Sequence, residues 1–353
     1  MIGAGYVIPY VLGNAMNNHL WKEMCDRLGR GEAVAVATIA TRDGSAPRSA
    51  GAKMLVGREG ILCGTLGGGP AEAMAAVEAV KALAGGESGL FSIDMGGSAA
   101  TGADLICGGM VRIFVQRLEP ASLAVLRLIW ERMRAGLDST VMTPVRGKPE
   151  PVLVLPGSEP DWLSEAMANG SGGACLFSHE GTEYLIEPLK ARTRLILVGG
   201  GHVSLATAQM AVLVDFEVTV LDDREEFANP SRFPWLEPGR TIVTPDFRGC
   251  LREDVLGFPV GGNCCIAILT RGHSFDEEAL AQALATPAGY VGMIGSRRKR
   301  DALYDRLAGR GVPRAALEKV HCPIGLPLGG DTPAEIAVSI VAELVSARVK
   351  GLA

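Results

Sequence analysis

The sequence of 353 residues contains few aromatic residues and no excess of positive charge. Phe, Trp and Tyr together make up 5% of the chain, and the formal net charge is −5 at pH 7. Proteins that bind nucleic acids usually present a basic surface, and those that bind single strands add aromatic side chains on which bases stack. The composition therefore argues against a nucleic-acid partner.

Long hydrophobic runs and closely paired cysteines are also absent from the sequence. No stretch reaches about 18 consecutive apolar residues, which predicts that the chain does not cross a membrane. The eight cysteines form no C-x-x-C pair, which argues against a structural zinc site. Because no secretory signal is recognisable, we expect a cytoplasmic protein with reduced thiols.

The first part of the sequence predicts an N-terminal extension followed by an α/β (α+β) domain. The opening residues "MIGAGYVIPYVLGNAMNNHL" are apolar but lack the basic start of a secretory signal. We interpret residues 1–18 as the extension and residues 19–190 as the domain. The short apolar runs at 139–190 are expected to complete its sheet. The patterns predict helices at 19–29, 71–84 and 120–136 and strands at 33–42, 52–56, 60–66 and 110–118.

From residue 194 the pattern changes to an alternation of strands and helices. Such an alternation is typical of a parallel sheet with helices on both faces. We therefore predict a Rossmann-like, doubly wound dinucleotide-binding domain over residues 191–353. Strands are predicted at 194–199, 217–222, 241–244, 263–270 and 289–294, and helices at 202–214, 275–286, 296–308 and 332–348.

In "LILVGGGHVSLATA" a buried strand runs directly into three glycines and a helix. In dinucleotide-binding folds the first glycine permits a tight turn and the second lets the backbone approach a pyrophosphate. These roles fall to Gly199 and Gly201, whereas Ser204 replaces the third glycine. The amides from His202 onward would hold the anion. Asp222 ends the next strand, where such folds place a ribose-binding acid. The alternative is that the glycines only turn the chain and bind nothing.

Two later strands also end in residues suited to an anion. Ligands of open α/β sheets bind at the carboxyl ends of the strands. His273 follows the fourth strand, and Arg297 follows the fifth, after Ser296 as a typical N-cap. A bound anion would offset the unfavourable placement of Arg297 at a helix start. The alternatives are a surface imidazole for His273 and a solvated basic helix face for Lys299 and Arg300.

The first domain contains a second glycine-rich turn, "GTLGGGPAEA". Its glycines at 67–69 can present amides to an anion, but the G-K-[ST] ending of a P-loop is missing. Pro70 suits the first turn of the helix that follows. Cys107 precedes two glycines in "LICGGMV", which would leave its thiol accessible to a ligand. A buried, inert cysteine is the commoner alternative.

Taken together, these motifs resemble those of the XdhC/CoxI family. "GSAPRSAGAKMLV", "GTLGGGPAEA" and "LICGGMVRIFVQ" are similar to the first domain of that family. "LVGGGHVSLATA", "VTVLDDREEFANPSRFP", "GMIGSRRKR" and "PIGLPLGGDTPAEIAVSIVAEL" are similar to its Rossmann domain. The resemblance implies a xanthine dehydrogenase accessory factor. Such a factor binds the molybdenum cofactor, protects it during sulfuration and inserts it into a xanthine dehydrogenase-type hydroxylase.

The resemblance also implies site residues and partners. Molybdopterin or its cytosine dinucleotide would bind by its phosphate at Gly199 and Gly201, and Asp222 would contact a ribose or pterin hydroxyl. The metal end would meet Gly67, Gly68 and Gly69, with Cys107 as a soft contact to molybdenum or its sulfur. A cysteine desulfurase is a further candidate partner, and a homodimer is the expected oligomer. Family members commonly carry Cys where this sequence has Pro70.

Two other functions remain open from the sequence alone. An NAD(P)-dependent oxidoreductase would need a proton donor, and His273 is the only attractive candidate. An interaction protein with a vestigial nucleotide pocket is the second alternative, because Pro70 removes the thiol that the family commonly has in the first glycine turn.

Overall fold

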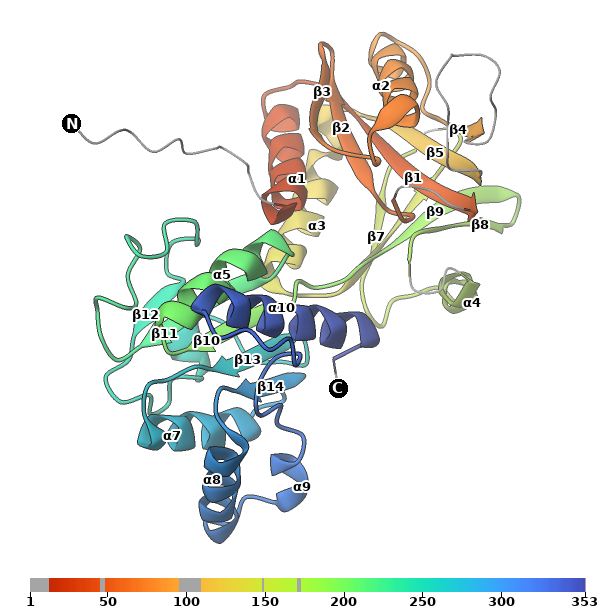
Figure 1. The fold of residues 1–353 in the computed structure, drawn as a ribbon. Coiled ribbons are helices and arrows are strands. Elements are labelled where there is room, and N and C mark those ends of the chain that lie inside the picture. Colours follow the sequence, from red (N-terminus) through yellow and green to blue (C-terminus); the bar gives the residue numbers. More distant parts are fainter. Residues whose placement is uncertain (1–12, 45–47, 95–108, 148, 170–172, 353) are drawn as a thin grey trace, which may run out of the picture. The chain divides into compact units, whose positions relative to one another are not determined.

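The structure is a computed structural model that describes residues 13–44, 48–94, 109–147, 149–169 and 173–352 (Figure 1). The described residues fall into two compact units, one from Ala15 to Ala191 and the other from Arg192 onward. Residues 1–12 of the expected N-terminal extension lie outside the described part. The first helix, α1 (Gly13–Gly29), begins ahead of the expected start at residue 19.

The first unit contains a five-stranded antiparallel sheet in the order β3-β2-β1-β5-β4. Successive strand residues face opposite sides, so each face needs its own cover. The helix α2 (Gly69–Leu83) packs against Ala35 and Ala37, whereas α1 and α3 (Leu123–Ala135) cover Val34 and Val36. A short 3-10 helix, η1 (Pro120–Ser122), precedes α3. The strands are β1 (Val34–Gly44), β2 (Lys53–Gly57), β3 (Gly60–Gly64), β4 (Gly89–Asp94) and β5 (Gly109–Leu118).

A second sheet follows within the same unit, so the prediction that residues 139–190 complete the first sheet is wrong. These strands pair with one another in the order β7-β6-β9-β8, and the helix α4 (Asp161–Asn169) packs beside them. Phe114 of the first sheet is buried together with Val145 and Leu185 of the second region. The two sheets therefore meet through side chains. The strands are β6 (Ser139–Pro144), β7 (Val152–Val154), β8 (Cys175–His179) and β9 (Thr182–Leu189).

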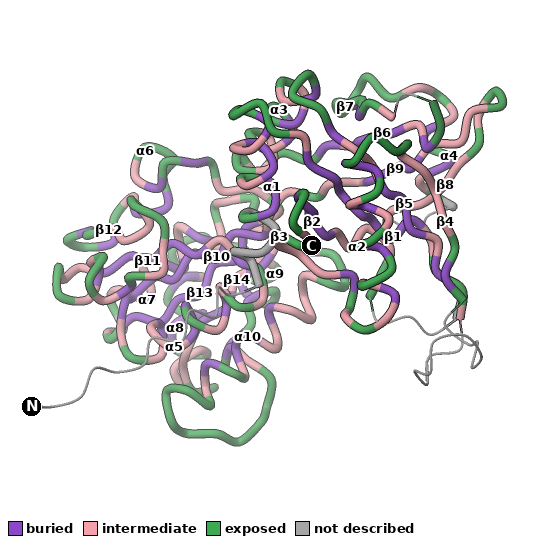
Figure 2. The backbone as a smooth tube through the Cα atoms, turned by 90° about the horizontal axis from the view of Figure 1, so that it is seen from above, coloured by how far each residue is buried: buried purple, intermediate pink, exposed green. Residues whose placement is uncertain are grey.

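The second unit contains the doubly wound parallel sheet that the sequence predicts. Its strands lie in the order β12-β11-β10-β13-β14, and all neighbours are parallel. Figure 2 shows that β10, β11, β13 and β14 are buried along most of their length, whereas the edge strand β12 is more exposed. Cys264 and Cys265 are both 0% exposed and belong to the cores on opposite faces, as a strand covered on both sides requires. The strands are β10 (Arg194–Val198), β11 (Glu217–Asp222), β12 (Thr241–Val243), β13 (Cys264–Ile268) and β14 (Tyr290–Met293).

Helices cover both faces of the parallel sheet. The core on one face includes α5 (His202–Leu213) and α10 (Pro333–Lys350), and the core on the other includes α7 (His273–Leu284) and α8 (Arg297–Gly309). The sequence did not predict the short helices α6 (Glu253–Leu256) and α9 (Arg314–Leu317). Within the described part of the chain, no helix combines the length and hydropathy needed to cross a bilayer.

Candidate functional site

The turn between β10 and α5 requires glycine at two of its three glycine positions. Gly199 has a φ of 105°, and a Cβ there would lie 2.6 Å from the Leu269 carbonyl oxygen. A Cβ on Gly200 would lie 2.2 Å from the Phe227 carbonyl oxygen. Around Gly201, by contrast, a Cβ would meet nothing within 4 Å. The first two glycines thus allow close backbone packing, and the third faces open space.

The first turn of α5 keeps its backbone donors available. Gly201 is the N-cap residue, and among the described residues no side chain caps this helix and its first turn holds no acid. The N–H groups of a first helical turn have no partner within the helix, and they favour an anion. His202, the first helical residue, is exposed. Ser204 is buried, and its hydroxyl donates to the Gly199 carbonyl, which accommodates serine where dinucleotide-binding folds have glycine.

Asp222 is buried at the end of β11, with 2% of its surface exposed. Its Oδ2 accepts from the Gly200 amide at 2.7 Å, and its Oδ1 accepts from the amide and Nε of Arg224 at 3.0 Å each. Burial raises the pKa of Asp222, but the hydrogen bonds from Arg224 and Gly200 outweigh burial, and the pKa lies below its ordinary value. The carboxylate therefore holds the glycine turn in shape, and both its oxygens are already bound within the protein.

Two arginines that the sequence did not single out lie beside the same turn. Arg232 donates from Nε to the Gly200 carbonyl at 3.3 Å, and its buried Nη2 has no hydrogen-bond partner among the described residues. The guanidinium carbons of Arg224 and Arg232 lie 3.6 and 4.9 Å from the ring centre of Phe227. The cationic groups are thereby positioned next to the uncapped start of α5. In the sequence, the only indication of these two arginines was the segment "REEFANPSRF", which is part of the sequence that resembles the XdhC/CoxI family.

The two other predicted strand-end residues lie at the carboxyl edge of the same sheet. His273 is the first residue of α7, but its side chain lies outside the described part of the structure. Arg297 is the exposed first residue of α8 and lines a cavity of about 660 Å³ together with residues 323–330. Ser296 caps α8, as expected, by accepting a hydrogen bond from the Lys299 amide at 3.2 Å.

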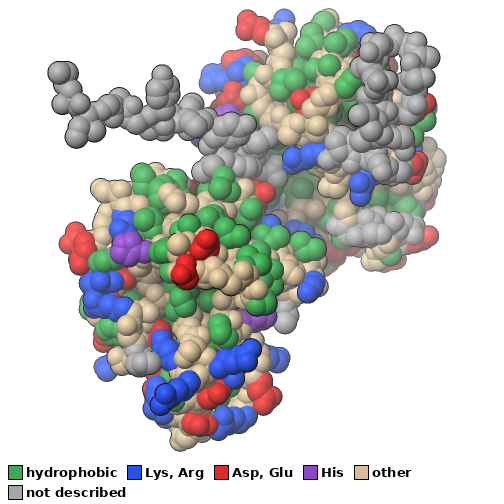
Figure 3. Space-filling view, in the orientation of Figure 1, with side chains coloured by type: hydrophobic (Ala, Val, Ile, Leu, Met, Phe, Trp, Pro, Cys, Tyr) green, Lys and Arg blue, Asp and Glu red, His purple; other side chains and the backbone are tan. Residues whose placement is uncertain are grey.

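Basic side chains gather over α8, as Figure 3 shows, but several of them have partners within the protein. Lys299 forms an ion pair with Asp276, which is 0% exposed and also accepts from the Thr270 hydroxyl at 2.6 Å. Arg300 donates to the Cys322 carbonyl at 3.2 Å. The ion pair of Lys299 with Asp276 therefore connects α8 to α7 at the carboxyl ends of the parallel strands. Sequence reasoning missed Asp276, because the two helices meet only in the folded chain.

The glycine turn between β3 and α2 differs in its hydrogen bonding. Glu72, in the first turn of α2, accepts from the amides of Leu66 at 2.8 Å and Gly68 at 3.1 Å, and from the Thr65 hydroxyl. The Gly67 amide donates to the Thr65 hydroxyl at 3.0 Å. Burial raises the pKa of Glu72, but these hydrogen bonds outweigh burial and lower it. The Gly68 amide, which was predicted to bind an anion, therefore already donates to a carboxylate of the protein itself, and the Gly67 amide donates to a hydroxyl.

Two family models match the chain. One, described as the XdhC Rossmann domain, matches residues 195–344, and the other, described as the XdhC and CoxI family, matches residues 28–94. The chain belongs to the XdhC and CoxI family. The family resemblance noted in the sequence is thereby confirmed.

Three proteins are similar to this XdhC and CoxI family member over most of its length. Escherichia coli (strain K12) YqeB is 27% identical over 89% of the chain, which spans 43% of YqeB, less than half its length. A probable xanthine dehydrogenase subunit of Bacillus subtilis (strain 168) is 25% identical, and the match covers 90% of the chain and 94% of that protein. The molybdenum cofactor insertion chaperone PaoD of Escherichia coli (strain K12) is 24% identical, with 92% and 86% covered.

A solved structure shares the fold of this family member. It is the crystal structure of a xanthine dehydrogenase from Bacillus halodurans, with 22% sequence identity and a TM-score of 0.74. The match covers 94% of the present chain and 96% of the other. The XdhC Rossmann match contains the turn at Gly201, and the N-terminal family match ends before Cys107. Cys107 lies outside the described residues, among which no group of three metal-ligating side chains occurs.

Proposed function

We propose that this chain binds the molybdenum cofactor and inserts it into a xanthine dehydrogenase-type hydroxylase. The observation that carries the proposal is the start of α5, where uncapped amides and the open space at Gly201 lie beside Arg232. Molybdopterin and its cytosine dinucleotide both carry phosphate, which needs such N–H donors and positive charge. The names of PaoD and of the Bacillus subtilis relative support the same role.

The residues around this turn fit a phosphate in distinct ways. The amides from His202 onward donate to it, and the orphaned Nη2 of Arg232 supplies a charged donor. Asp222 acts by holding the Gly200 amide and Arg224, in place of the ribose or pterin contact expected from the sequence. His273 and Arg297 remain proposed contacts farther along the sheet edge, where Arg297 lines its cavity.

The geometry of Asp222 weighs against the NAD(P)-dependent oxidoreductase. A nucleotide of that class commonly uses the acid at the end of the second strand to bind its ribose. Here that carboxylate is 2% exposed and both its oxygens accept hydrogen bonds from within the protein. The experiment below separates the two cofactors and also the third alternative, an interaction protein with an empty pocket.

The first test is the cofactor content of the full-length protein purified from cells that make molybdenum cofactor. Pterin is measured by oxidation and fluorescence, and NAD(P)H by absorbance. The proposal expects pterin approaching one per chain and no nicotinamide. Stoichiometric nicotinamide with turnover would establish the oxidoreductase instead. An empty protein that still binds a molybdenum hydroxylase would establish the interaction protein.

A charge placed at Gly201 tests where the cofactor binds. Because a Cβ is accommodated there, Gly201→Asp should fold normally, but its carboxylate would repel the phosphate. We expect pterin retention to fall about tenfold or more, equivalent to about 1.4 kcal/mol of lost binding. The matched control is Gly262→Asp. Gly262 is an equally open glycine just before β13, at the end of the sheet where the parallel strands begin. Equal retention in both variants would rule out the α5 site.

The metal end of the cofactor is proposed to meet Cys107; in the turn at residues 67–69, which the family resemblance also assigns to it, the Gly68 amide already donates to Glu72. Cys107→Ala should weaken cofactor retention and increase loss of molybdenum, as measured by metal analysis of the purified protein. Unchanged pterin and molybdenum would remove Cys107 from the site. The proposal also includes support of sulfuration, with a cysteine desulfurase as a partner. It further includes a homodimer as the oligomeric state.

A further inference from the structure

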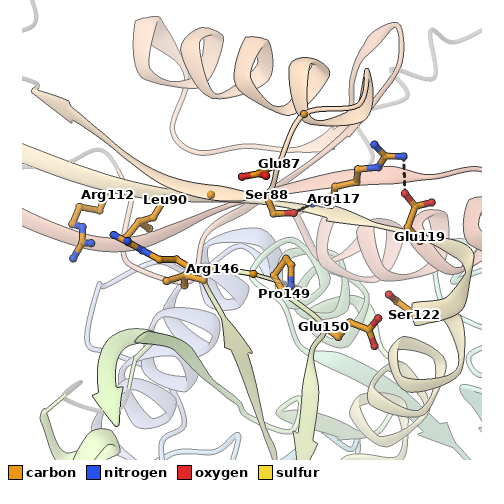
Figure 4. A pocket seen from close by; sticks show the side chains of 14 residues that line it. Glu87, Ser88, Leu90, Arg112, Arg117, Glu119, Ser122, Arg146, Pro149 and Glu150 are labelled. Atoms are coloured by element: carbon orange, nitrogen blue, oxygen red, sulfur yellow. Dashed lines mark hydrogen bonds and ion pairs between the residues drawn. The ribbon is translucent and has the colours of Figure 1, made fainter. Parts of the chain in front are cut away.

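A polar cavity in the first unit lies apart from both glycine turns. Its volume is about 820 Å³, within the range of small-ligand and peptide sites. It is lined by the start of β4, by residues of β5 and by the connection between β6 and β7. The charged residues in its wall are Glu87, Arg112, Arg117, Glu119, Arg146 and Glu150 (Figure 4).

The start of an edge strand, β4, borders this cavity, and so does the segment that leads into β7. β4 is the last strand of the first sheet and β7 the last strand of the second, and neither has a further strand partner among the described residues. Gly89 and Leu90 of β4 line the cavity, and so does Pro149, shortly before β7. An edge strand presents unpaired N–H and C=O groups, to which an extended peptide can add as a further strand.

The exposed charges of Arg146 and Glu150 lie toward different ends of the cavity. Figure 4 shows Arg112 and Arg146 toward one end, and Glu119, Ser122 and Glu150 toward the other, where Arg117 also lies and pairs with Glu119. The described part of the chain supplies no ion-pair partner for Arg146 or Glu150, and both are exposed. Each end can therefore attract a side chain of opposite charge.

The equal numbers of positive and negative side chains in the cavity wall indicate which class of ligand it can bind. Three arginines face three glutamates in the lining, so a polyanion such as a nucleic acid or a polyphosphate would meet repulsion. Arg112 also pairs with Glu183 at 3.2 Å, and Arg117 pairs with Glu119 at 2.7 Å, which reduces the free positive charge further. Leu90, Val145 and Pro149 add apolar surface to the wall. This cavity wall suits a ligand that carries an acidic group at one end, an apolar group in the middle and a basic group at the other end.

We propose that the cavity binds an extended peptide segment of a partner protein, which adds to the edge of β4. The segment places an acidic side chain toward Arg112 and Arg146 and a basic side chain toward Glu150. Backbone hydrogen bonds to β4 supply affinity, and the two charged ends set the direction of the peptide. This inference does not depend on the cofactor proposal, because none of its residues lies in either glycine turn.

Calorimetric titration of the full-length protein with two blocked peptides tests the inference. The probes are acetyl-Asp-Ala-Val-Ala-Lys-amide and the same residues in reverse order, acetyl-Lys-Ala-Val-Ala-Asp-amide. We expect one order to bind at least tenfold more tightly than the other, since only one direction satisfies both the charges and the strand pairing. The double variant Arg146→Glu, Glu150→Lys should reverse that preference, because it exchanges the charges at the two ends.

Two controls complete the test. Arg58→Glu changes an exposed arginine in the turn between β2 and β3, outside the cavity, and should leave the preference unchanged. Circular dichroism confirms that each variant is folded. Absence of binding by either peptide, or equal binding of the two orders, would overturn the inference. So would tight binding of the free dipeptide Asp-Lys alone, which would indicate a small-molecule site. A double variant that keeps the wild-type preference would contradict the assigned ends.

Discussion

Both units place three consecutive glycines where a strand leads into a helix, at residues 67–69 at the start of α2 and at 199–201 before α5. Each turn also has a carboxylate within hydrogen-bond distance of its amides, but the two carboxylates come from different places. Glu72 stands in the first turn of the helix itself and binds the amides of Leu66 and Gly68. Asp222 comes from the neighbouring strand, binds only Gly200 among the glycines, and is paired with Arg224.

A glycine-rich turn can bind an anion only when its backbone donors are left free, and the two turns differ in this respect. In the first unit an internal carboxylate occupies the donors and adds negative charge, which disfavours a second anion. In the second unit the carboxylate is neutralised by Arg224, and the amides at the start of α5 are left without a side-chain cap from the described residues. Similar residue patterns in the sequence thus produce opposite local electrostatics.

The largest effect that would test this comparison concerns backbone packing. Gly199→Ala forces a Cβ against the Leu269 carbonyl, whereas Gly68→Ala meets open space at a φ of 76°. We expect Gly199→Ala to lower the free energy of unfolding by about 4 kcal/mol and Gly68→Ala by about 1 kcal/mol. Urea unfolding of the full chain, followed by circular dichroism, measures both. Similar losses in the two variants would mean that the turns are not packed differently.

A smaller effect is expected for Asp222→Asn. The amide oxygen can still accept from Gly200, but Arg224 loses its ion pair, at a cost of about 2 kcal/mol. The folded pKa of Asp222 lies below the ordinary 3.8, so its stabilisation is fully present above that value and is lost as the pH falls through the folded pKa. The stability gap between wild type and variant should therefore close in strong acid. A gap that stays the same from neutral pH down to strong acid would show that the ion pair is not its source.

The smallest effect concerns the first glycine turn. Glu72→Ala frees the amides of Leu66 and Gly68 and should destabilise the protein by about 1 kcal/mol, since the carboxylate is partly exposed. Its pKa is also lowered, so this loss too should fade as the pH falls below the ordinary 4.5. Inorganic phosphate should then shift the amide resonances of the turn in the variant and leave those of the wild type unmoved. Equal shifts in both proteins would show that Glu72 does not close the turn.

The strands of the parallel sheet and their membership of one sheet were predictable from the sequence. For the second antiparallel sheet only the presence of strands was predictable. β11 was predicted at 217–222 and is observed as Glu217–Asp222. A strand buried on both faces is a near-continuous apolar run, as in β13 (Cys264–Ile268), so its bounds are visible in the residues alone. The strands β6 to β9 form a separate antiparallel sheet, and the pairing of β6 with β9 brings together residues far apart in the chain. Their patterns therefore predicted strands without saying which sheet they form.

The candidate site was predictable in its position and only partly in its residues. The glycines at 199–201 could be identified because a strand, a tight turn and a helix follow one another directly. Arg232 and Asp276 could not, because each becomes relevant only when a distant segment lies beside it. The acid in the first turn of α2 was visible in the sequence, but such an acid commonly serves only the helix dipole.

The amino-acid sequence by itself determined the order of strands and helices, the doubly wound class of the second unit, the glycine turns and the family. These features depend on local patterns of apolar residues and on glycine, whose effects act over a few neighbours. Only the tertiary structure decided which carboxylate reaches which amide, and so which turn keeps free donors. It also placed the start of β4 and the segment before β7 at the borders of one charged cavity, because contacts between distant segments arise from packing that no local pattern encodes.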